Sequence, residues 1–163
     1  MNILITGADR GLGFGTCRCL LERGHTVFAG QYLTKWNELV ELQRQYPDNL
    51  HIIELDVTNL ESVKQAVNEV HSKTDVLDMI INNAGIIGHA IPRTGEPPEQ
   101  LLDLQESDIR PAAPEEGLEQ DYAAMRAAYE VNALGTARVV ECFLFLMKNS
   151  SLKRLCFVSS EAG

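Results

Sequence analysis

The chain has 163 residues, 45% of them hydrophobic, which suits a single domain with a substantial core. Its formal net charge of −9 argues against a surface for nucleic acid or for an anionic membrane, because such surfaces need clustered Lys and Arg. Four cysteines, at positions 17, 19, 142 and 156, lack zinc-finger spacing, so we expect no metal site and a reducing, cytoplasmic location. Met1 leads directly into an apolar run, which favours a strand over a signal peptide.

Apolar runs and helical periodicities alternate along the chain. They predict strands over residues 2–6, 26–30, 50–55, 77–81 and 154–158, and helices over 11–23, 35–46, 59–73 and 123–149. Short strands separated by helices are typical of βαβ units with a parallel sheet. We therefore expect a Rossmann-like, three-layer α/β/α fold with about five parallel strands in the order 3-2-1-4-5. A ligand is expected at the carboxyl ends of these strands.

Residues 88–121 depart from this alternation. They hold five of the six prolines, and their acidic residues outnumber their two arginines. A loop of this length in a compact domain is either functional or poorly ordered. We interpret the chain as one domain, residues 1–163, that carries a proline- and acid-rich insertion at about 88–121.

The first predicted strand ends in a glycine-rich turn that reads TGADRGLG over residues 6–13. Glycines let a backbone turn tightly and approach a ligand without a Cβ in the way. The helix that follows presents backbone N–H groups at its N-terminus, where a pyrophosphate can bind. Such turns also occur without a ligand, so this motif alone is weak evidence.

Polar motifs follow three other predicted strands: DVT at 56–58, NNAG at 82–85 and SS at 159–160. The last predicted helix carries VNALG at 131–135. Each of these is compatible with an ordinary turn, strand end or helix interior. Because the carboxyl ends of parallel strands meet at one edge of a sheet, their joint occurrence favours a dinucleotide site.

With these motifs the chain resembles the short-chain dehydrogenase/reductase family, in the branch with a TGxxxGxG turn and an NNAG strand end. The resemblance covers nearly the whole chain outside residues 88–121. It implies an NAD(P)-dependent oxidoreductase that reduces a carbonyl or oxidises an alcohol of a small-molecule substrate by hydride transfer. The implied cofactor-binding residues are Thr6, Gly7, Asp9, Arg10, Gly11, Leu12, Gly13, Asp56, Val57, Asn83, Ala84 and Gly85. Asn132 would hold a water in a proton relay, and Ser160 would polarise the substrate carbonyl.

The second predicted strand ends in Ala-Gly-Gln-Tyr at positions 29–32, without the carboxylate that usually binds the ribose hydroxyls of NAD. Arg10 stands inside the glycine turn, where members of the family that use NADP(H) often carry a basic residue. We therefore favour NADP(H) over NAD(H). The usual second basic residue is missing, with Tyr32 in its place, and Arg10 could also be a solvated turn residue.

The family's catalytic tyrosine and lysine, which follow the serine by about a dozen residues, are not among these 163 residues. Tyr122 and Tyr129 do not replace them, because neither has a lysine four positions later. We expect a C-terminally incomplete, cofactor-binding portion that is inactive by itself. The alternative is a catalytically inactive nucleotide-binding or partner-binding module. We also expect homo-oligomers, formed through helix 123–149 or through an exposed edge of the fifth strand.

Overall fold

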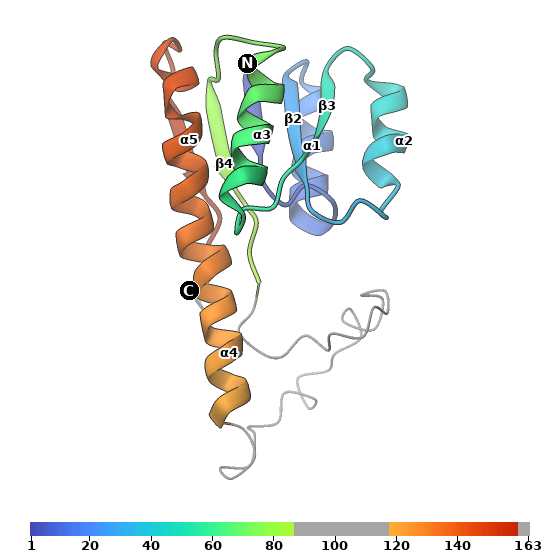
Figure 1. Cartoon of the computed structure of the whole chain (residues 1–163). Helices are drawn as coiled ribbons and strands as arrows, with labels where there is room; N and C mark the ends of the chain where they lie inside the picture. Colours follow the sequence, from blue (N-terminus) through green and yellow to red (C-terminus); the bar gives the residue numbers. More distant parts are fainter. Residues whose placement is uncertain (87–117, 160–163) are drawn as a thin grey trace.

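The computed structural model describes residues 1–86 and 118–159, around a five-stranded parallel sheet in the order β3-β2-β1-β4-β5. The strands are β1 (Asn2–Ile5), β2 (Thr26–Gln31), β3 (Leu50–Glu54), β4 (Met79–Asn82) and β5 (Arg154–Phe157). The helices are α1 (Gly11–Glu22), α2 (Glu38–Gln45), α3 (Leu60–His71), α4 (Leu118–Tyr129) and α5 (Thr136–Lys148), with a π-helix, η3 (Glu130–Gly135), between the last two. The strand order and the three-layer fold are as the sequence predicts (Figure 1). Most of the predicted insertion, as well as Ser160, lies outside the described residues.

The alternation of side chains along each strand divides the core into two layers. In β1, Ile3 and Ile5 join the buried cluster that packs α1 and α2 against one face of the sheet. Leu4 points the other way and joins the cluster formed by α3 and α5. Because successive side chains of a strand face opposite sides, one short apolar run covers both layers at once.

The central strand β1 fixes the register of the sheet. Ile5 is aligned with Ala29 of β2 on one side and with Ile81 of β4 on the other. The three strands therefore end at nearly the same level, and the turns that follow them lie close together. This alignment brings the glycine turn, the β2–α2 connection and the NNAG motif to one edge of the sheet.

Two helix predictions were wrong in part. The helix predicted over 35–46 begins only at Glu38, because the preceding residues form a connection held by side-chain hydrogen bonds described below. The helix predicted over 123–149 begins earlier, at Leu118, and is interrupted by η3. None of residues 118–134 is Gly or Pro, so nothing in the local sequence stops the helix there.

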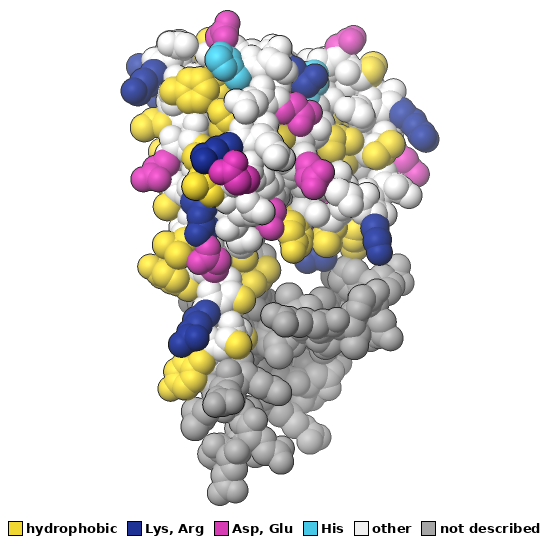
Figure 2. Space-filling view, in the orientation of Figure 1, with side chains coloured by type: hydrophobic (Ala, Val, Ile, Leu, Met, Phe, Trp, Pro, Cys, Tyr) yellow, Lys and Arg dark blue, Asp and Glu magenta, His cyan; other side chains and the backbone are white. Residues whose placement is uncertain are grey.

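Large apolar side chains remain on the surface of the last two helices. Tyr122, Met125 and Tyr129 on α4 are each exposed, as are Leu144 and Phe145 on α5. Figure 2 shows hydrophobic side chains gathered along this side of the molecule. In the described part of the chain β5 pairs only with β4, and all four of its residues are exposed. Self-association through these surfaces stays a prediction.

Candidate functional site

In the turn from β1 into α1, the backbone at the start of the helix lies close to the backbone at the end of the strand. Gly7 has a φ of +62° and Gly11 a φ of +53°, values that favour glycine. A Cβ on Gly13 would lie 2.1 Å from the carbonyl oxygen of Gly7, so only glycine fits there. No side chain caps the N-terminus of α1, and its first turn carries no acid. The first backbone N–H groups of α1 are thus available to an anion, which fits the pyrophosphate of a dinucleotide.

Thr6 joins this turn to the end of β4. Its hydroxyl oxygen, in a side chain that is 2% exposed, accepts from the N–H of Asn83 at 3.0 Å and from that of Ala84 at 2.9 Å. The side-chain amide of Asn83 donates back to the carbonyl oxygens of Thr6 at 3.0 Å and Gly7 at 2.9 Å. The structure therefore brings together the glycine turn and the NNAG motif that the sequence singled out separately.

Asn132 lies in η3 and reaches the backbone that follows the NNAG motif. Its side-chain oxygen accepts from the N–H of Ile86 at 2.9 Å, and its amide nitrogen donates to the carbonyl oxygen of Ile86 at 2.9 Å. A Cβ on Gly85 would lie 3.5 Å from the same Asn132 oxygen. The proposed catalytic asparagine is thus held beside the proposed cofactor-binding residues. Ser160, the other residue predicted to be catalytic, lies outside the described residues.

The end of β3 is connected to η3 as well. The Asp56 carboxylate accepts from the backbone N–H and the hydroxyl of Thr58, so it closes its own turn. Val57 is buried and packs against Gly135. A Cβ on Gly135 would lie 2.7 Å from the Cγ2 of Val57. The Arg138 guanidinium donates to the Val57 carbonyl oxygen. Of the two cofactor-binding residues implied here, Asp56 and Val57, only Asp56 keeps an appreciably exposed side chain.

Sequence reasoning missed two residues, one at the end of β2 and one in the connection that follows it. Gln31 is buried, and its amide donates to carbonyl oxygens of the β2–α2 connection. Trp36 lies in that connection, with the Arg10 guanidinium carbon 5.8 Å from the centroid of its ring. Asp9 is buried and accepts from the N–H groups of Tyr32 and Leu33. A glutamine at a strand end was visible in the sequence, but its inward orientation was not.

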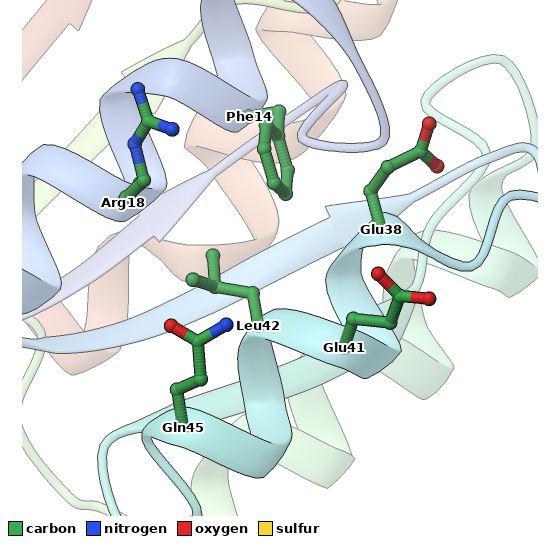
Figure 3. Close-up of a pocket in the computed structure, with 6 residues that line it drawn as sticks. All are labelled: Phe14, Arg18, Glu38, Glu41, Leu42 and Gln45. Atoms are coloured by element: carbon green, nitrogen blue, oxygen red, sulfur yellow. The ribbon is translucent and has the colours of Figure 1, made fainter.

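A separate hollow of about 200 Å³ lies between α1 and α2 (Figure 3). It is lined by Phe14, Arg18, Glu38, Glu41, Leu42 and Gln45. None of these is a predicted site residue. Within residues 1–86 and 118–159, His, Cys, Asp and Glu side chains form no group of three that could hold a metal ion. No helix in this part of the chain has the length and apolar character that crossing a membrane requires.

Comparison with known proteins identifies the family. A sequence model described as short chain dehydrogenase matches residues 1–163. The chain belongs to the short-chain dehydrogenase family. Its curated relatives include human 17-beta-hydroxysteroid dehydrogenase type 2, to which it is 34% identical over 163 residues, 99% of this chain and 36% of that protein.

Two solved structures of short-chain dehydrogenase relatives match the fold. Salutaridine reductase from Papaver somniferum has a TM-score of 0.76 at 22% identity, over 98% of this chain and 57% of that one. An NADPH-bound carbonyl reductase from chicken fatty liver has a TM-score of 0.61 at 27% identity, over 90% of this chain and 50% of that one. The chain thus spans between 36% and 57% of the length of these three relatives. Members of the short-chain dehydrogenase family bind a nicotinamide dinucleotide.

The close approach between Gly13 and the Gly7 carbonyl can be tested with two alanine variants in α1. Gly13→Ala should lower the free energy of unfolding by about 2–3 kcal/mol, since its Cβ meets the Gly7 carbonyl. Gly15→Ala should leave the stability unchanged or raise it by about 0.5–1 kcal/mol, because a Cβ there meets nothing within 4 Å. Urea unfolding measures both, and equal effects would contradict the geometry.

The contribution of the Thr6 hydroxyl to stability can be tested by replacing threonine with valine, which has nearly the same shape. Thr6→Val leaves the N–H groups of Asn83 and Ala84 without their acceptor, so we expect a loss of about 2–4 kcal/mol in unfolding free energy. Thr6→Ser keeps the acceptor and loses one methyl group, at a cost of about 1 kcal/mol. Denaturant unfolding of both variants checks this. A valine variant as stable as the serine variant would show that these bonds contribute little.

Proposed function

We propose that the protein to which this chain belongs transfers hydride between NADP(H) and a small-molecule carbonyl or alcohol. The bound dinucleotide supplies the hydride chemistry, and the protein supplies position and electrostatics. Thr6, Gly7, Asn83 and Ala84 form the hydrogen-bonded frame that would hold the dinucleotide turn. The N–H groups at the start of α1 would bind its pyrophosphate.

The preference for NADP(H) depends on one observation, the arrangement of charge at the end of β2. Arg10 is exposed beside the turn, whereas the nearby Asp9 carboxylate is buried and already accepts two backbone N–H groups. Gln31 carries no charge, and its amide donates into its own connection. An exposed carboxylate that binds the ribose hydroxyls of NAD is therefore missing from this position. The NADPH-bound carbonyl reductase among the similar structures agrees with this preference.

The proposed catalytic contribution of this chain comes from Asn132 and Ser160. A carbonyl that accepts hydride develops negative charge on its oxygen, and a preorganised hydroxyl such as that of Ser160 would stabilise it. Asn132 would hold the water of a proton relay, and its two hydrogen bonds to Ile86 support this role by fixing the π-helical turn. For the 163 residues alone we propose binding without turnover, because the family's tyrosine and lysine are not among them.

Isothermal titration calorimetry with NADPH and NADH tests the cofactor preference. We expect NADPH to bind more tightly, and Arg10→Ala to lower its affinity about tenfold, because a charged hydrogen bond to the 2′-phosphate is lost. The affinity for NADH should change less than twofold. Arg18→Ala is the matched control, since it removes an arginine of α1, the helix that follows Arg10, and Arg18 lies 4.0 Å from Glu22. Equal affinity for NADH and NADPH, unaffected by Arg10→Ala, would refute the preference.

A further inference from the structure

Two buried polar side chains form hydrogen bonds that hold the connection between β2 and α2, residues 32–37. Asp9 accepts from the N–H of Tyr32 at 2.8 Å and from that of Leu33 at 3.3 Å. Gln31 donates its amide to the carbonyl oxygens of Leu33 and Trp36, both at 3.1 Å. Because both side chains are more than nine-tenths buried, these bonds are shielded from competing water.

These bonds determine where Trp36 lies. Its carbonyl oxygen accepts from Gln31, and its N–H donates to the carbonyl oxygen of Leu33 at 3.2 Å. The backbone of Trp36 is therefore bound on both sides before α2 begins at Glu38. Because the Trp36 backbone is held in this way, its indole ring can act as a fixed platform on which another side chain packs.

The group that lies over this platform is the Arg10 guanidinium, whose central carbon is 5.8 Å from the ring centroid. Arg10 forms no ion pair with any acid in the described part of the chain. A guanidinium is attracted to the face of an indole ring and keeps N–H donors free for a phosphate. The ring also restricts a long side chain that would otherwise lose rotamer freedom when the ligand binds.

We propose that Trp36 is a specificity-determining residue of the dinucleotide site, because its ring holds the Arg10 guanidinium in position for a 2′-phosphate on the adenosine ribose. This inference rests on the proposed preference for NADP(H) and names the device that would produce it. Trp36 acts through Arg10 and makes no contact with the reacting atoms. It replaces, in function, the second basic residue whose place after β2 is taken by Tyr32.

Two ligands that differ only by the phosphate isolate this effect: adenosine 2′,5′-bisphosphate and AMP. Calorimetry on the 163-residue chain should show the bisphosphate bound about tenfold or more tightly than AMP. Trp36→Leu should weaken the bisphosphate about three- to fivefold, the size of an exposed cation–π contact, and AMP less than twofold. Trp36→Phe keeps an aromatic face and should retain most of the affinity.

The background of Arg10→Ala separates this role from a merely structural one. If Trp36 acts by holding Arg10, Trp36→Leu has no further effect on bisphosphate binding once Arg10 is absent. The proposal is wrong if Trp36→Leu weakens both ligands equally, or if it costs the same with and without Arg10. If the unsubstituted chain binds both ligands equally, the NADP(H) preference itself fails, and this inference with it. Circular dichroism of each variant establishes that the fold is retained.

Trp36 is also the only tryptophan of the sequence, so the unsubstituted chain reports on the same contact directly. Its fluorescence should change on titration with adenosine 2′,5′-bisphosphate, because a phosphate that pairs with the guanidinium changes the charge next to the indole ring. AMP should produce a smaller change at equal saturation. The same fluorescence change with both ligands would contradict a role linked to the 2′-phosphate.

Discussion

The contact between the start of α1 and the carbonyl of Gly7 is the constraint on which the candidate site depends. Because Gly13 has no Cβ, α1 can approach the turn that precedes it, and a Cβ at this position would overlap the Gly7 carbonyl. The Asn83 amide then binds the inward carbonyl oxygens of Thr6 and Gly7. These two carbonyl groups are therefore satisfied, whereas the first N–H groups of α1 have no partner within the helix, as at any helix N-terminus. This polarity makes a turn between a strand and a helix suitable for a phosphate.

The same frame extends from the turn to the last helices. Thr6 binds the backbone at Asn83 and Ala84, and two residues further along Ile86 binds Asn132 of η3. On the other side, Gly135 at the end of η3 packs against Val57, which follows β3. The hydrogen bonds of a π-helix span one residue more than those of an α-helix, which changes the direction of the side chains beyond it. Here the π-helical turn coincides with the residues that contact both strand ends.

The architecture could be predicted because apolar strands, helix periodicities and glycine turns are local signals that agree with one another. The interruption at η3 could not, since a single π-helical turn leaves the apolar pattern of the flanking segments intact. The Trp36 connection was mistaken for the start of a helix because it contains no glycine or proline to mark a boundary. Gln31 was noted only as a missing carboxylate. Whether the side-chain amide of such a residue faces water or binds nearby backbone carbonyl groups depends on the loop that it helps to form.

The charge of the chain explains why local donors matter in this site. A net charge of −9 opposes the approach of a multiply phosphorylated ligand, although salt screens that repulsion beyond about 8 Å. In the proposed site, affinity would therefore come from groups in direct contact with the ligand: the N–H groups at the start of α1 and the Arg10 guanidinium. An acid beside Arg10 would normally compete for that guanidinium. Asp9 does not pair with it, because its two oxygens accept from the backbone of Tyr32 and Leu33. The carboxylate thus orders the connection that carries Trp36 and does not pair with the cation that we propose for the ligand.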